Sequence, residues 1–341
     1  MPVSQRSKTA SMPETPQDNA HDERRLRAWT ITDGKKGMEV QVEGIAKALG
    51  LAFDIKRVSP RGPWRWLAPW IGIDPQEHFA RPGSQFCAPW PNIALATGRL
   101  SIPALRAVRK ASPQTFTVVV QDPRTGTGTA DLIAVPAHDK LTGENVIQTL
   151  TAPHGFSPER LGVLRAEVPQ SIAALPGPRV VVVLGGPNSV YRFTQEDSVR
   201  LARSIASIAG LGVSFLVTAS RRTPDHSLDA VTAAISQSPH SIWTGNGPNP
   251  YENWLAHGDF FIVTADSVNM TGEACATGKP VYVFSPEGGS AKFNRFHENL
   301  RRYGATKPLP ERIGNLENWS YAPLDSASQI AAEIRRRWRP H

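Results

Sequence analysis

Apolar runs of five or six residues alternate along this chain with helical patterns, and short polar or glycine-rich loops separate them. The first such unit starts with a predicted strand at 26–32 and a loop at 33–37. An amphipathic stretch at 38–51 and a second apolar run at 53–58 follow. Strand, loop, helix and strand in this order are typical of parallel sheets.

The same pattern recurs along both halves of the chain. Further strands are predicted at 92–97, 116–121, 131–136, 179–184, 214–218, 241–244, 260–264 and 280–284, the last closing the second sheet. Their uninterrupted apolar character fits strands covered on both faces. A proline-rich stretch at 167–178 separates the halves. The sequence therefore predicts an α/β fold of two doubly wound, Rossmann-like domains that face a cleft. The predicted boundaries are a disordered tail at 1–27, domains at 28–172 and 173–324, and a C-terminal helix at 325–341.

Length and composition agree with this organisation. The 341 residues suffice for two cores, and two isolated cysteines exclude a disulfide scaffold. No apolar run reaches about 18 residues, and the N-terminus lacks the apolar core of a signal peptide. We therefore expect a cytoplasmic protein. The net charge of +8 leaves three partners open: nucleic acid, an anionic membrane and a phosphorylated small ligand.

Several familiar cofactor and metal motifs are absent from the sequence. Gly126 and Gly128 are not followed by a predicted helix, so they form no dinucleotide fingerprint. Pro280 stands where a phosphate loop requires Ser or Thr after Gly278–Lys279. Neither H-E-x-x-H nor D-x-D occurs, and no helix-turn-helix or basic repeat is visible. We expect no metal, no resident cofactor and no nucleic-acid partner.

The segment 264–281 carries the clearest chemical signal. A strand delivers small polar residues to a helix start, where exposed N–H groups favour a phosphate. Glu273 lies about one turn further, where a carboxylate can accept hydrogen bonds from two sugar hydroxyls. The structural alternative is that Ser267 caps the helix and Glu273 favours its first turn.

Three other loops of the second half are candidates for ligand contact. Gly185, Gly186 and Asn188 combine close backbone approach with a side-chain amide, although a tight turn would also explain them. Ser220 and Arg221 follow a strand, and arginine suits phosphate binding. In that pair of arginines we favour Arg221 over Arg222 as the ligand contact. Asn246 belongs to a rigid, amide-rich loop that would frame a base or sugar, or serve only as a turn.

The segment 264–281 resembles the donor-sugar motif of GT-B glycosyltransferases, with Val268 in place of the usual glycine. By this resemblance Glu273 binds the ribose, and the diphosphate faces the helix start at Ser267, Asn269 and Met270. The predicted donor-binding set is Gly185, Gly186, Asn188, Ser220, Arg221, Asn246, Asp266, Ser267, Asn269, Met270 and Glu273.

A wider resemblance covers nearly the whole ordered chain. Its motifs are 32–37 (TDGKKG), 121–124 (QDPR), 136–139 (PAHD), 185–188 (GGPN), 220–223 (SRRT) and 245–251 (GNGPNPY). Together and in this order they resemble the mitochondrial-fission "elongated mitochondria" factor family, which has many bacterial members. The first loop departs from the common form, with Met38 and Val40 where His and Asn are frequent.

The first half supplies candidates for the acceptor side. In the GT-B enzymes that the chain resembles, a carboxylate or histidine of this domain deprotonates the acceptor hydroxyl. Asp33 is the first candidate base, and His138 with Asp139 the second; a turn or N-cap role is the alternative for Asp33. The predicted acceptor-side residues are Gly34, Lys35, Lys36, Gly37 and Arg99. Their three cations would meet an anionic acceptor or serve only as solvated surface charges. Three tryptophans in 63–71 suit a membrane interface, a lipid-linked acceptor groove or simple burial.

Three functions are consistent with these features. The first is a metal-independent GT-B glycosyltransferase that moves a sugar from a nucleotide sugar to an acceptor at a membrane. The second is a non-catalytic, membrane-associated adaptor on the same fold, of the fission-factor type. The third is a nucleotide-sugar epimerase. Peripheral attachment to the inner membrane face fits the first two, with the terminal arginines 335–337 and 339 as a further basic patch.

Overall fold

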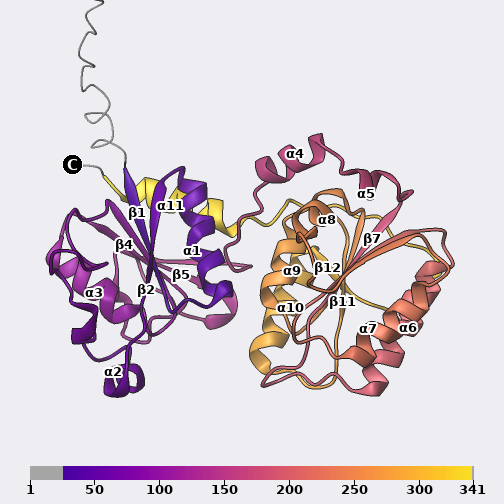
Figure 1. Ribbon diagram of the computed structural model, residues 1–341, viewed down its shortest axis with the longest axis horizontal. Helices are drawn as coiled ribbons and strands as arrows, with labels where there is room; N and C mark the ends of the chain where they lie inside the picture. The colour runs from indigo at the N-terminus through magenta and orange to yellow at the C-terminus, as the bar shows by residue number, and fades with distance from the viewer. Residues whose placement is uncertain (1–25, 340–341) are drawn as a thin grey trace, which may run out of the picture.

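Two six-stranded parallel sheets, each flanked by helices, form two domains side by side (Figure 1). The computed structural model describes residues 26–339, so most of the predicted tail at 1–27 lies outside the described residues. Within 26–339, no helix combines the length and apolarity that crossing a bilayer requires.

The first domain has the strand order β2-β1-β3-β4-β5-β6, with all pairs parallel. Its strands are β1 (Arg27–Thr32), β2 (Ala52–Arg57), β3 (Ile93–Thr97), β4 (Phe116–Val120), β5 (Leu132–Pro136) and β6 (Val146–Thr149). Its helices are α1 (Lys36–Leu49), α2 (Gly62–Leu67) and α3 (Ile102–Ala111). Buried residues of β3 and β4 pack on both faces of the sheet, as the continuous apolar runs predicted.

The second domain has the order β12-β11-β10-β7-β8-β9, which is the 3-2-1-4-5-6 order of the Rossmann fold. Its strands are β7 (Arg179–Leu184), β8 (Ser214–Ala219), β9 (His240–Trp243), β10 (Phe260–Thr264), β11 (Val281–Phe284) and β12 (Thr306–Pro308). Its helices are α6 (Gln195–Ala209), α7 (Asp225–Ile235), α8 (Tyr251–His257), α9 (Val268–Cys275) and α10 (Ala291–Tyr303).

The prediction that 280–284 closes the second sheet is wrong. β12 pairs with the outer side of β11 and is the edge strand. It has three residues and includes Pro308, so it carries too little periodic signal to be seen in the sequence. The edge strand β6 of the first sheet is missing from the sequence prediction for a similar reason, since it is only four residues long and partly exposed.

The chain crosses between the domains twice (Figure 1). Helices α4 (Pro158–Ala166) and α5 (Gln170–Ala173) bury Leu161 and Ile172 in the core of the second domain, which therefore begins before the predicted boundary at 172/173. Helix α11 (Ser326–Arg337) returns to the first domain and packs Ile330 and Ile334 against α1. The C-terminal helix is thus part of the first domain's core.

Candidate functional site

Each sheet has one topological switch point, where ligands of open α/β sheets bind beyond the strand ends. In the first domain it lies between β1 and β3, and in the second between β7 and β10. The loops predicted to carry chemistry, after Thr32, Leu184 and Thr264, all leave strands next to these points.

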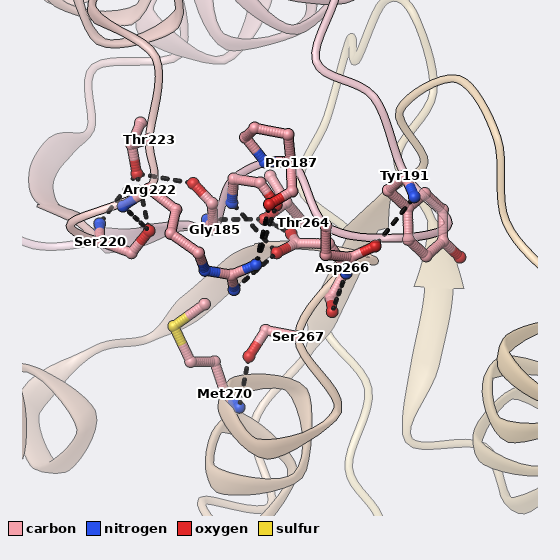
Figure 2. A network of polar contacts seen from close by, with 12 residues as sticks. Gly185, Pro187, Tyr191, Ser220, Arg222, Thr223, Thr264, Asp266, Ser267 and Met270 are labelled. Carbon is pink, nitrogen blue, oxygen red and sulfur yellow. Dashed lines mark hydrogen bonds and ion pairs between the residues drawn. The ribbon is translucent and has the colours of Figure 1, made fainter. Parts of the chain in front are cut away.

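At the second switch point, the Asp266 carboxylate ties the glycine loop to β10 (Figure 2). It accepts hydrogen bonds from the Gly186 N–H at 3.0 Å and the Thr264 hydroxyl at 2.7 Å, and Thr264 accepts from the Gly185 N–H at 2.8 Å. The Asp266 side chain is fully buried, and burial raises its pKa. Both of its carboxylate oxygens accept hydrogen bonds from protein groups, so Asp266 fixes the conformation of the loop.

Arg222, rather than the favoured Arg221, organises the neighbouring loop (Figure 2). Its guanidinium lies 3.4 Å from the Asp266 carboxylate and donates to the Pro187 carbonyl at 3.0 Å, while Arg221 is exposed. The turn that aims it is closed by Ser220, whose N–H donates to Thr223 Oγ1 at 2.8 Å. Half of the Arg222 side chain remains exposed and open to a ligand.

Among the remaining donor-side residues, Asn188 and Ser267 hydrogen-bond to backbone N–H groups of their own segments, while Asn246 is exposed to solvent. The Asn188 amide accepts from the N–H groups of Val190 and Tyr191, at 2.8 and 2.9 Å, and stabilises its own loop. Ser267 caps α9 by accepting from the Met270 N–H at 3.3 Å, which is the structural alternative stated above.

A cavity of about 1110 Å³ lies between the domains and holds the Glu273 carboxylate. Glu273 projects from α9 and accepts a hydrogen bond from the Tyr251 hydroxyl, at the start of α8, at 2.8 Å. Burial raises the pKa of Glu273 to about 6, and burial together with the Glu273 charge raises that of Tyr251. The first domain contributes one face of α1, including Lys36 and Glu43.

The two crossing segments also line this cavity and bring unpaired polar atoms to it. His154 Nε2 and Asp325 Oδ2 are buried and have no hydrogen-bond partner among residues 26–339. Burial lowers the pKa of His154 and so disfavours the charged form of its ring, although the nearby Asp325 opposes this shift. Such atoms are unusual in a folded protein and suit a polar ligand that supplies the missing partners.

A second cavity, of about 390 Å³, opens at the switch point of the first domain. Asp33, Lys35, Arg99 and Asp139 line it, which brings together four predicted acceptor-side and catalytic residues. Asp33 is paired with Lys35 at 2.5 Å.

Lys36, the next residue, lines the larger cavity, so both cavities border the start of α1. Gly34 adopts a positive φ of 80°, which glycine tolerates best, and turns the loop. A Cβ on Gly37 would lie 3.2 Å from the Asn269 amide, so this turn of α1 touches α9 of the second domain.

His138 is not part of the lining of this cavity. Its ring is 5% exposed and packs edge-on against Phe296 of α10, 5.7 Å between ring centroids. Burial, with Lys292 and Arg295 nearby, lowers its pKa to about 4 despite the charge of Asp139. The structure therefore places His138 at a contact between the domains, and places Asp139 in the cavity wall.

Comparison with protein families decides where the chain belongs. Residues 36–338 match the family model described as Mitochondrial fission ELM1. The chain belongs to this family. The Mitochondrial fission protein ELM1 of Arabidopsis thaliana is 33% identical over 271 residues, which cover 72% of this chain and 64% of that protein. The chain thus spans less than two thirds of the length of this curated ELM1 relative.

Solved structures agree on the fold of this ELM1-family chain. A UDP-GlcNAc 2-epimerase from Methanocaldococcus jannaschii, in complex with UDP-GlcNAc and UDP, has a TM-score of 0.51 at 10% identity. The match covers 91% of this chain and 100% of the epimerase. The Neisseria meningitidis UDP-GlcNAc 2-epimerase bound to UDP-GlcNAc has a TM-score of 0.50 at 13% identity, and this match also covers 91% of this chain and 100% of the epimerase. At such identities the likeness shows the fold alone, which is the predicted GT-B-like pair of Rossmann-like domains.

The structure adds residues to the ELM1-family site that sequence reasoning did not select. Tyr251, His154 and Asp325 join the larger cavity, and Arg65 and Arg124 join the smaller one. Tyr251 stood at the end of one of the recurring motifs, and Arg124 at the end of another, so those motifs held the only sequence signal for them. Within 26–339, no three His, Cys, Asp or Glu side chains come together as a metal site.

Proposed function

We propose that this ELM1-family chain is a metal-independent GT-B-type glycosyltransferase, with the nucleotide sugar held by the second domain and the acceptor by the first. The observation that carries the proposal is the cavity of about 1110 Å³ between the domains, with the Glu273 carboxylate inside it. Its volume is slightly above the usual range of small-molecule sites, which is about 300–1,000 Å³, so the cavity has room for a nucleotide sugar. The expected independence of metal follows from the absence of a D-x-D motif in the sequence.

The donor side combines three kinds of polar group. Glu273 and Tyr251 would bind ribose hydroxyls, because an ionised carboxylate accepts from two neighbouring hydroxyls. The start of α9 would face the diphosphate with its N–H groups. The exposed half of Arg222 would stabilise charge on the departing diphosphate, in the place that the sequence analysis gave to Arg221.

On the acceptor side, three carboxylates line the smaller cavity, namely Asp33, Asp122 and Asp139, and the sequence singled out Asp33 and Asp139. In the proposed reaction, Asp33 takes the proton of the acceptor hydroxyl. The acceptor oxygen then bonds to the anomeric carbon of the donor sugar, and the bond from that carbon to the nucleoside diphosphate breaks. Lys35 holds the Asp33 carboxylate at 2.5 Å and keeps it oriented. Asp139 is paired at the same distance with Lys292 of α10, and therefore bridges the domains.

A thermal-shift screen with UDP, GDP, ADP and CDP tests donor binding. One nucleoside diphosphate at about 100 times its dissociation constant is expected to stabilise the protein by about 2.7 kcal/mol. The melting temperature of the protein should rise accordingly. No rise with any of the four would contradict the proposal.

Product analysis separates the possible activities. A radiolabelled sugar of the matching nucleotide sugar should move to a cell-extract acceptor, and it should remain in the donor without one. Conversion to an isomeric nucleotide sugar without acceptor would identify an epimerase instead. Binding without turnover in either assay would favour the non-catalytic adaptor.

We further infer that the acceptor is presented at an anionic membrane. Three large apolar residues on and after α2 are exposed: Trp66 by 75%, Leu67 by 53% and Trp70 by 63%. Arg65 on the same helix is exposed beside them, and Arg106 shares a surface hollow with Trp70. Exposed tryptophan next to arginine suits the interface of an anionic bilayer.

The arginines of α11 support this membrane role less than their number suggests. Arg335 donates to the Ala48 carbonyl at 2.7 Å, and Arg336 and Arg337 pair with Glu333. The Arg335 contact joins α11 to α1 of the first domain, and the two ion pairs stabilise α11 internally. The basic patch expected at the terminal helix is thus mostly engaged within the protein.

Vesicle co-sedimentation tests the α2 surface. The wild type is expected to sediment with vesicles containing phosphatidylglycerol and much less with neutral vesicles. The Trp66→Ser/Trp70→Ser variant should lose at least about tenfold in partitioning, because two interfacial rings are removed. A Trp338→Ser variant serves as control, since this tryptophan packs partly buried against the first-domain core. Equal sedimentation of all three proteins would refute the assignment of α2.

A further inference from the structure

The cavity at the first switch point has a charge distribution that the transfer reaction alone does not require. Five cationic side chains line it together with three carboxylates: Lys35, Arg65, Arg99, Arg124 and Lys292 with Asp33, Asp122 and Asp139. Two of these cations are neutralised, because Lys35 pairs with Asp33 and Lys292 with Asp139, both at 2.5 Å. The three arginines remain.

These arginines retain most of their hydrogen-bonding capacity. Arg99 donates one N–H to the Ala68 carbonyl at 2.8 Å. The side chains of Arg65 and Arg124 make no hydrogen bond or ion pair within the part of the chain that the structure describes, although both line the cavity. A guanidinium group carries five N–H donors. The cavity therefore has an excess of positive charge and many free donors.

The backbone of the loop after β4 is held in an uncommon shape at this place. Gln121 has a φ of 79° and Arg124 a φ of 62°, in the left-handed region that non-glycine residues rarely adopt. The Gln121 N–H donates to the Ala134 carbonyl, and the Arg124 N–H to Asp122 Oδ1, each at 2.8 Å. Such strain persists where the surroundings fix it, and it is concentrated at ligand sites. Here it brings Arg124 to the cavity.

We propose that this cavity binds a phosphate or diphosphate group of the acceptor, with Arg65, Arg99 and Arg124 as its ligands. The inference rests on the proposed transferase function and names the class of acceptor. Arginine pairs with phosphate oxygens through two parallel hydrogen bonds, which suits three guanidinium groups around one diphosphate. The anion lies beside Asp33, so the group it belongs to is placed within reach of the candidate base.

The position of Arg65 connects this site to the surface of α2. Arg65 belongs to the helix whose Trp66 and Leu67 are exposed, while its own side chain lines the cavity. A phosphate on a lipid anchor would therefore reach the arginines from the face proposed to contact the membrane. A phosphate of a small dissolved acceptor would bind the same groups.

Isothermal titration of the full chain with inorganic pyrophosphate tests the site. The wild type is expected to bind it, and Arg65→Gln/Arg124→Gln to bind it at least about tenfold more weakly, since two of the three guanidinium groups that would pair with the anion are removed. Both side chains are exposed, so the variant should keep its fold. Arg312→Gln, an exposed arginine outside both cavities, is the matched control and should bind as the wild type does. No binding by the wild type, or equal binding by all three, overturns the proposal.

Two further experiments complete the test. The first distinguishes a lipid-borne from a soluble phosphate, and the second distinguishes a failure of the donor site from a failure of the anion site. If vesicles containing phosphatidic acid displace pyrophosphate from the wild type, the site accepts a lipid-borne phosphate; binding of pyrophosphate without displacement assigns it a soluble one. Glu273→Gln should retain pyrophosphate binding, because Glu273 belongs to the other cavity. Pyrophosphate binding without any nucleotide response would overturn the donor site and keep the anion site.

Discussion

Replacing Glu273 by glutamine is expected to stabilise the free protein at pH 8 and to weaken its response to nucleoside diphosphates. The carboxylate is buried beside the Tyr251 hydroxyl, and burial raises its pKa from 4.5 to about 6. A shift of this size corresponds to about 2 kcal/mol of cost for keeping the charged form in the folded protein. Glutamine has no charge to bury and can still accept from Tyr251.

The pH dependence of this effect has a defined sign. The folded protein holds the Glu273 proton more tightly than the unfolded chain, so the group stabilises the fold below pH 4.5 relative to higher pH. This stability is lost as the pH rises to about 6 and above. The stability difference between variant and wild type should grow from near zero at pH 4.5 to about 2 kcal/mol at pH 8. Urea denaturation at both pH values measures it.

Nucleotide affinity should change in the opposite direction to stability. An amide offers one acceptor oxygen and no charge, so the dissociation constant should rise at least about tenfold in Glu273→Gln. Wild-type affinity should fall as the pH drops below 6, where Glu273 becomes protonated. Glu252→Gln is the matched control, because Glu252 lines the same cavity but is an exposed partner of Arg160. If both variants keep wild-type affinity, the ribose does not bind at Glu273.

Periodicity sufficed for the long, buried elements of this fold. The run of valines in β7 occupies the predicted residues 179–184, and the helix α6 spans Gln195–Ala209. Helix α6 also has a local start signal, since Thr194 and Asp197 form a reciprocal capping box. Short edge strands such as β12 depend on tertiary pairing and carry no comparable signal.

The candidate site was predictable by location and less so by role. Ligands of such sheets bind beyond the carboxyl ends of the strands, and Asp33, Asp266 and Glu273 were selected because they lie in or just after loops that follow predicted strands. Whether such a side chain faces a ligand or the protein depends on contacts distant in sequence. Asp266 turns inward to Gly186, 80 residues away, and Glu273 meets Tyr251, 22 residues away. Arg221 and Arg222 are adjacent, and only the turn at Ser220 decides which points inward.

Replacing Gly185 by alanine is expected to lower stability by about 3 kcal/mol, the upper end for overpacking of a buried site. A Cβ at this position would lie 2.2 Å from Asp266 Oδ1. The carboxylate has little room to retreat, because the Gly186 N–H, the Thr264 hydroxyl and Arg222 hold it. Moving it would leave the buried Gly186 N–H and Thr264 hydroxyl unpaired, which adds to the cost.

The matched control for Gly185→Ala is Gly162→Ala in α4. No atom lies within 4 Å of a Cβ at Gly162, and an exposed helical glycine gains about 0.5–1 kcal/mol on replacement by alanine. The two substitutions add the same methyl group, so the melting temperature should fall for the first and rise for the second. Gly185→Ala should also lose the nucleotide response, since the loop beside α9 is displaced. Equal melting temperatures for both variants would mean that the Asp266 carboxylate can move aside at little cost in stability. Asp266 would then not fix the loop at the second switch point.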